Sequence, residues 1–99
     1  MVALYEIELK VPLGIRHGMM TLKTDGESVN GYMEIMGSKT GFTGTLKEDR
    51  IAVTGTIKTL VRLIEYEGKG ELQNGQIHMQ LQDKKRSYML TGKLKTEEM

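Results

Sequence analysis

The chain has 99 residues and a mass of 11.2 kDa, with 38% apolar and 27% charged residues, so we expect one folded domain spanning residues 1–99. Fourteen Lys and Arg against thirteen Asp and Glu give a formal charge of +1, which argues against a nucleic-acid partner. No cysteine is present, which excludes disulfides and Cys-type zinc sites. The chain has neither a bilayer-spanning apolar run nor a signal peptide, so we expect a cytoplasmic protein without a membrane partner.

Apolar and polar residues alternate along most of the chain, which is the period of a β-strand. The first predicted strand begins near the N-terminus, where Ala3, Tyr5, Ile7, Leu9 and Val11 share one face. Glycine-containing or polar turns then separate further strands. The sequence predicts eight strands, at about residues 2–11, 18–24, 27–37, 40–47, 50–58, 61–73, 76–82 and 87–95.

Two-residue turns set the register between these strands. Asn74-Gly75 is the strongest, because this dipeptide favours the positive backbone angles of a type I′ hairpin, and it places Leu72 opposite Ile77. Further turns are predicted at Asp25-Gly26, Ser38-Lys39, Glu48-Asp49 and Lys84-Lys85, and near Thr59-Leu60. Because a slip of one residue would turn every side chain to the other face, the repeated apolar register indicates an antiparallel meander.

The same counting pairs inward glycines with large residues, for example Gly31 with Met20 and Gly55 with Phe42. It also pairs Ile35 with Phe42 and Gly55 with Ile64. One segment stays open between two interpretations, because Thr59–Glu67 also fits a short helix.

An apolar sheet with two free edges exposes unpaired backbone, and closing the eighth strand onto the first removes both edges. We therefore expect an all-β fold, an eight-stranded antiparallel meander closing into a small barrel. The interior of such a barrel is either filled by side chains or holds one small ligand. The inward glycines fit both cases.

This meander with glycine-punctuated hairpins resembles the calycin-like barrels, which include lipocalins and fatty-acid-binding proteins. The resemblance covers nearly all residues but concerns architecture only, since the lipocalin Gly-x-Trp signature is missing from a chain without tryptophan. It implies a binding protein for small apolar or amphipathic molecules. No specific binding residue is carried over.

The order of the turns sorts the charges between the two ends of the barrel. One end, called the basic end below, receives segments 12–17, 38–39, 59–60 and 83–86, with the cations Arg16, His17, Lys39, Lys58, Arg62, Lys84, Lys85 and Arg86. The opposite end carries Asp25, Glu27, Glu48 and Asp49 beside Lys23, Lys47 and Arg50. A basic mouth would concentrate an anion, whereas the alternative is that lysine-rich loops only keep the turns soluble.

Arg62 is the most specific candidate for a binding residue. Alternation places it on the inward face with Ile64 and Tyr66, where it could clamp a carboxylate or phosphate while Tyr66 or Tyr88 donates a further hydrogen bond. The alternatives are a bulge at residues 59–61 that turns Arg62 outward, or an ion pair with Glu65.

The segment 12–18 is predicted to be the longest loop. Its apolar residues Leu13 and Ile15 would form a lid over a ligand or a permanent plug of the barrel end. Together with Arg62, Tyr66 and Tyr88, the predicted ligand-binding residues are Leu13, Ile15, Arg16, His17, Lys39, Lys84 and Arg86.

Catalytic motifs, glycine-rich phosphate loops and histidines at metal-ligand spacing are all absent from the sequence, so we expect no enzyme activity, no cofactor and no metal site. The leading hypothesis is a binding barrel for a small amphipathic anion. The alternative is an interaction module with a solid core, in which Tyr32, Met36 and Met89, with Met19, form an outward patch for a homodimer or partner.

Overall fold

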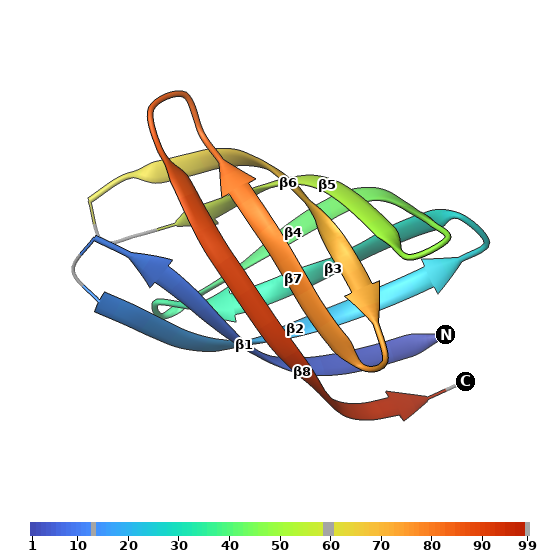
Figure 1. The fold of residues 1–99 in the computed structure, drawn as a ribbon. Coiled ribbons are helices and arrows are strands. Elements are labelled where there is room, and N and C mark those ends of the chain that lie inside the picture. Colours follow the sequence, from blue (N-terminus) through green and yellow to red (C-terminus); the bar gives the residue numbers. More distant parts are fainter. Residues whose placement is uncertain (13, 59–60, 99) are drawn as a thin grey trace.

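A computed structural model describes residues 1–12, 14–58 and 61–98. The strands are β1 (Val2–Val11), β2 (Gly14–Asp25), β3 (Ser28–Ile35), β4 (Ser38–Lys47), β5 (Arg50–Lys58), β6 (Leu63–Gln73), β7 (Gln76–Gln82) and β8 (Ser87–Glu98). Each strand runs antiparallel to its neighbours in chain order, and β8 pairs with β1 to close the barrel (Figure 1). The predicted closed eight-stranded meander is confirmed.

The described residues contain no helix, and therefore none that could cross a membrane. Residues 63–67 belong to β6, so the helical interpretation of that part of the segment is wrong. The predicted turn at Thr59-Leu60 lies outside the described residues, as does Leu13.

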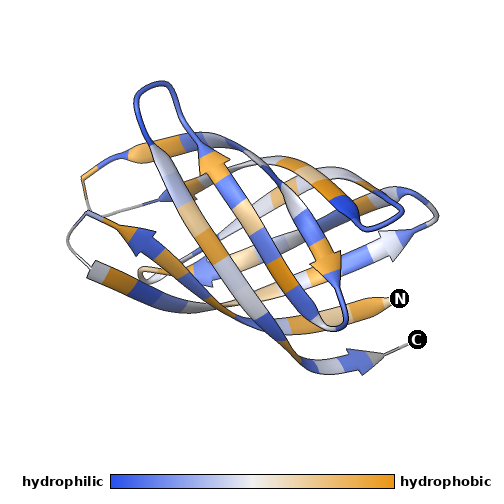
Figure 2. Cartoon of the chain, in the orientation of Figure 1, coloured by the Kyte–Doolittle hydropathy of each residue, from blue (hydrophilic) through white to orange (hydrophobic). Residues whose placement is uncertain are grey.

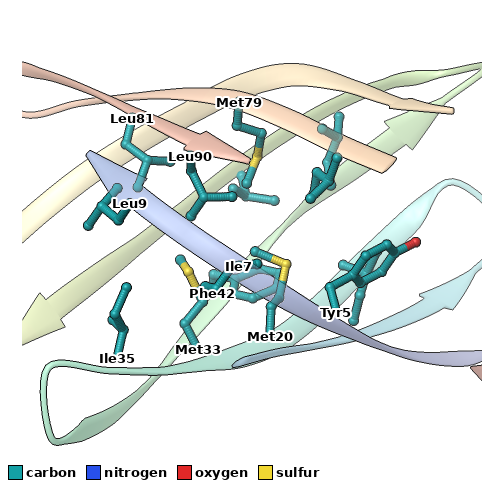
Figure 3. Packing of buried hydrophobic residues seen from close by; sticks show 14 of the residues in the cluster. Tyr5, Ile7, Leu9, Met20, Met33, Ile35, Phe42, Met79, Leu81 and Leu90 are labelled. Atoms are coloured by element: carbon teal, nitrogen blue, oxygen red, sulfur yellow. The ribbon is translucent and has the colours of Figure 1, made fainter. Parts of the chain in front are cut away.

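Buried and exposed residues alternate along most strands. Figure 2 shows that the hydropathy of the residues alternates along the strands as well. In β1, Tyr5, Ile7 and Leu9 are buried, whereas Glu6 and Glu8 between them are exposed. The inward side chains of all eight strands form one apolar cluster, in which Leu9 and Leu90 are partners across the seam between β1 and β8 (Figure 3). No charged residue in the described part of the chain is buried. The core is therefore held by apolar packing alone.

Three predicted registers are confirmed without change. The Asn74-Gly75 turn has φ values of 53° and 73°, as a type I′ turn requires, and Leu72 lies opposite Ile77. The registers across Glu48-Asp49 and between β7 and β8 also match the prediction.

The β2–β3 and β3–β4 turns differ from the prediction. The β2–β3 turn is Gly26-Glu27, and its first position needs a positive φ that Gly26 supplies with 61°. The β3–β4 turn is Met36-Gly37, with φ values of 53° and 77°, and is of type I′. The predicted Ser38-Lys39 turn would have placed two side-chain-bearing residues at positive φ. Glycine position therefore decided both turns.

These differences change which residues are cross-strand partners, but each side chain stays on the predicted face of the sheet. Met20 pairs with Met33 instead of Gly31, and Ile35 pairs with Ser38 instead of Phe42. Across β5 and β6, Gly55 pairs with Tyr66 instead of Ile64. Each pairing slides by two or four residues, and an even slide keeps inward side chains inward.

The predicted long loop at residues 12–18 is wrong. Strand β2 already begins at Gly14, and its first residues pair with the end of β1, with Arg16 opposite Leu9 and His17 opposite Glu8. Since pairing between β2 and β3 starts only at Gly18, this hairpin extends beyond the neighbouring strand at the basic end. Ile15 therefore lies in a strand and cannot act as part of a loop lid.

Candidate functional site

A groove opens at the basic end, where β6 and β7 separate. Pairing between them begins at Glu67 and Gln82, so residues 63–66 of β6 pair with β5 but not with β7. After Gln82 the chain turns away into the β7–β8 hairpin, which projects from the barrel in Figure 1. Residues 62–67 form one wall of the groove and residues 82–86 the other, with a volume of about 800 Å³.

Asp83 shapes the hairpin wall of this groove. Its Oδ1 atom accepts hydrogen bonds from the backbone N–H groups of Lys85 and Arg86, both at 2.7 Å, and its own N–H donates to the Arg86 carbonyl at 3.0 Å. These two backbone donors, with a smaller contribution from the Arg62 charge, lower the pKa of the Asp83 carboxyl. The ionised carboxylate thus fixes the turn that carries the exposed Lys84, Lys85 and Arg86.

A short chain of polar contacts joins the two walls. The Nη2 atom of Arg62 lies 3.5 Å from the Tyr88 hydroxyl oxygen, to which it donates, and that hydroxyl donates to Oδ2 of Asp83 at 3.4 Å. Tyr88 is buried, whereas Arg62 is exposed. The chain orients the guanidinium at the rim of the groove.

Of the positions that the sequence left open for Arg62, the structure has an exposed one, because Arg62 precedes β6, which begins at Leu63, and strand alternation does not apply to it. Arg62 donates a hydrogen bond to Tyr88, and Glu65 is exposed on the outer face. The structure brings Arg62 and Tyr88 into contact. Their role in ligand binding remains a prediction.

Tyr66 lies beside this chain but within the core. Its side chain is 4% exposed, and its hydroxyl has no hydrogen-bond partner among the described residues. The ring packs across its strand partner Gly55, where an added Cβ would lie 2.8 Å from the hydroxyl oxygen. Burial strongly raises the pKa of Tyr66. No polar contact joins Tyr66 to the groove cations that the structure describes.

The interior of the barrel is filled at this end. A void of about 20 Å³ lies behind the groove, lined by Leu9, Val11, Met36, Ile57, Ile64, Tyr66, Leu81 and Tyr88. Such a volume holds about one water molecule and cannot accept an alkyl chain. Of the two interiors that the sequence left open, the structure has the solid one at this end, so a small ligand that binds here would occupy the external groove.

The remaining predicted site residues are spread over the basic end. Lys84 and Arg86 line the groove, and Arg16 and Ile15 are exposed on the β1–β2 hairpin. His17 and Lys39 instead lie on the outer face of the barrel. His17 Nδ1 is 3.7 Å from a Glu8 carboxylate oxygen, and Lys39 Nζ is 3.9 Å from a Glu34 carboxylate oxygen and 3.9 Å from the centroid of the Tyr32 ring. The structure therefore does not bring His17 or Lys39 to the groove.

Three of the four residues in the predicted outward methionine patch lie on the outer face. Met19, Tyr32 and Met89 are half-buried on the outer face, as their positions in the strands require. Met36 occupies the first position of a turn and packs against the core, so it does not belong to that patch. Within the described residues, no three His, Asp or Glu side chains are grouped so that they could hold a metal ion.

The fold and this groove define a class, a small closed β-barrel with a solid core and a cationic surface groove. No protein-family model matches the chain, and no curated protein matches it in sequence. Its fold is similar to that of a solved structure, the REP1-NXSQ fatty acid transporter, with a TM-score of 0.54 and 15% sequence identity over 95% of this chain and 96% of that chain. At this identity the similarity establishes the barrel fold alone.

Proposed function

We propose that the protein is a non-enzymatic binding barrel that takes a small amphipathic anion in the groove between β6 and the β7–β8 hairpin. The observation that carries the proposal is the pairing of charge with apolar surface in one groove. Arg62, Lys84 and Arg86 lie there with Leu63 and Ile64. The similar barrel of a protein named as a fatty acid transporter supports this class of ligand.

The groove offers separate places for the two parts of such a ligand. A carboxylate, sulfonate or phosphate group would lie at the hairpin wall, where the guanidinium of Arg62 is oriented by Tyr88. The apolar part would lie over Leu63, whose side chain is 57% exposed, and Ile64, which is half-buried. Glu65 and Glu67 on the β6 wall repel an anion, so they favour the hairpin side for the charged group.

The test uses 1-anilinonaphthalene-8-sulfonate, a fluorescent amphipathic anion, and its displacement by decanoate. We expect Arg62→Ala to raise the dissociation constant of the probe about tenfold, because a charge-assisted hydrogen bond contributes about 1.5–3 kcal/mol. Arg50→Ala is the matched control, since Arg50 is exposed at the opposite end, and its affinity should equal that of the wild type. Thermal unfolding of each variant checks that the barrel is intact.

Native mass spectrometry after gentle purification, with a lipid extract as control, provides a second test. A co-purifying anion of low mass would support the proposal. Failure of both the probe and the lipid extract to bind would refute it. The same conclusion would follow if Arg62→Ala and the double variant Lys84→Ala/Arg86→Ala bound the probe as the wild type does.

A further inference from the structure

Exposed apolar side chains gather at the basic end of the barrel. In the described residues five large hydrophobic side chains are exposed, and two of them, Met1 and Val2, belong to the N-terminus at the opposite end. The other three are Ile15, Val61 and Leu63, which are 46%, 89% and 57% exposed.

These three residues belong to chain segments that converge at one pole. Ile15 lies on the β1–β2 hairpin, and Val61 and Leu63 lie where the chain enters β6. The small void beneath this pole is lined by both Val11 at the end of β1 and Ile64 near the start of β6, so the two segments meet over the same part of the core. The three exposed apolar residues thus lie at one end of the barrel, which we call the apolar tip.

Cations lie at the same end of the barrel as the apolar tip. Arg16, Lys58, Arg62, Lys84, Lys85 and Arg86 are all exposed at the same end. Asp83 lies among them, and its carboxylate is already engaged by the backbone of the hairpin turn. Exposed apolar side chains and several cations at one end of a molecule are the surface pattern of a protein that rests on an anionic lipid surface, with apolar side chains inserted and cations among the head groups.

We infer that the basic end of the barrel docks onto membranes that contain anionic lipid. The expectation of no membrane partner rested on the lack of a spanning segment, and docking requires none. A second copy of the chain fits this end poorly, because two poles with this excess of cations would repel each other. The inference does not depend on the proposed function, since docking needs no ligand in the groove.

The first experiment measures co-sedimentation with vesicles of phosphatidylcholine alone or mixed with phosphatidylserine. The wild type should bind the mixed vesicles and lose this binding as the salt concentration increases. It should bind vesicles of phosphatidylcholine alone at least about tenfold more weakly, because several cations attract anionic lipid. Lys84→Glu/Lys85→Glu should weaken binding at least about tenfold. The control Lys23→Glu/Lys47→Glu makes the same charge change at the opposite end and should leave binding intact.

The second experiment uses the absence of tryptophan from the chain. Leu63→Trp introduces a single indole at the apolar tip, and its emission should shift to shorter wavelength when mixed vesicles are added. Val2→Trp places the indole at an exposed site at the opposite end and should show no shift. Ile15→Ser/Leu63→Ser should reduce vesicle binding with little change in the melting temperature, because both side chains are about half exposed.

Four results would overturn the inference. The first is that the wild type does not bind mixed vesicles at low salt, and the second is that Lys23→Glu/Lys47→Glu loses as much vesicle binding as Lys84→Glu/Lys85→Glu. The third is that the emission of Leu63→Trp does not shift. The fourth is that sedimentation velocity shows a dimer, which Ile15→Ser/Leu63→Ser dissociates. The last result would show that a second copy covers the tip. Binding of 1-anilinonaphthalene-8-sulfonate to the wild type in solution without vesicles tests the proposed function separately. If the wild type binds this probe but not the vesicles, docking fails and the proposed function stands.

Discussion

The buried hydroxyl of Tyr66 lowers the stability of this barrel. Its ring fills the space above Gly55, but its hydroxyl is buried without a partner among the described residues. A buried polar group without a hydrogen bond costs about 1–3 kcal/mol. The aromatic ring is therefore favourable to the fold, whereas the oxygen atom is not.

We predict that Tyr66→Phe raises the free energy of unfolding by about 1 kcal/mol at neutral pH, because it removes the unsatisfied hydroxyl and keeps the ring. Urea denaturation provides the measurement. Tyr32→Phe is the control, since Tyr32 is only half-buried on the outer face and should give no such gain. A loss of stability in Tyr66→Phe would mean that the hydroxyl has a partner in solution.

The same residue should make the barrel sensitive to alkali. Burial raises the pKa of Tyr66 above its usual 10.0, so between pH 10 and the higher folded value the unfolded chain loses a proton that the folded chain keeps. The stability contribution of Tyr66 is thus complete below pH 10 and declines as the pH rises. Tyr66→Phe should remove most of this decline, and Tyr5, whose pKa is also raised mainly by burial, should account for a remainder.

At the scale of the strands, the sequence predicted what depends on alternation and missed what depends on backbone angles. The inward residues of β1 and the pairing of β7 with β8 were predicted, because alternate residues of a strand lie on opposite faces of the sheet. The turns at Gly26-Glu27 and Met36-Gly37 were not, because they depend on which residue takes a positive φ. The groove was also not predicted; it forms where the pairing between β6 and β7 stops.

The β4–β5 turn gives a prediction at this scale. Glu48 adopts a φ of 57° at the first turn position, where the β2–β3 turn has Gly26 with a φ of 61°. A positive φ costs a residue with a Cβ atom about 1 kcal/mol, so Glu48→Gly should raise the free energy of unfolding by up to that amount. Glu27→Gly, at the second position of the other turn, should bring no gain. Thermal unfolding compares the two, and equal effects would refute the explanation.

For the whole molecule, the solid interior separates this barrel from one that encloses its ligand. The void near Tyr66 and Ile64 has about 20 Å³, whereas the external groove has about 800 Å³. Ligand binding is then expected at the surface, and the core serves to hold the groove walls in place. The charges of residues 83–86 were predictable from the sequence, but the filling of the interior was not, because it depends on how all eight strands pack.

Acrylamide quenching tests this arrangement. Bound 1-anilinonaphthalene-8-sulfonate should remain accessible to the neutral quencher if it lies in the groove, and it would be protected if it entered the barrel. Leu81→Ala enlarges the interior void and should cost about 2–5 kcal/mol of stability without strengthening probe binding. Stronger, protected binding in this variant would place the ligand inside.

The seam between β1 and β8 has a practical consequence. Val2 pairs with Glu98, so the two chain ends leave the barrel side by side, at the end opposite the groove (Figure 1). A tag or tether fused to either terminus therefore departs away from Arg62 and the β7–β8 hairpin. Protein immobilised on a sensor surface through such a tether will present its cationic pole to the solution, and a short linker between the termini would make the chain circular without crossing the groove.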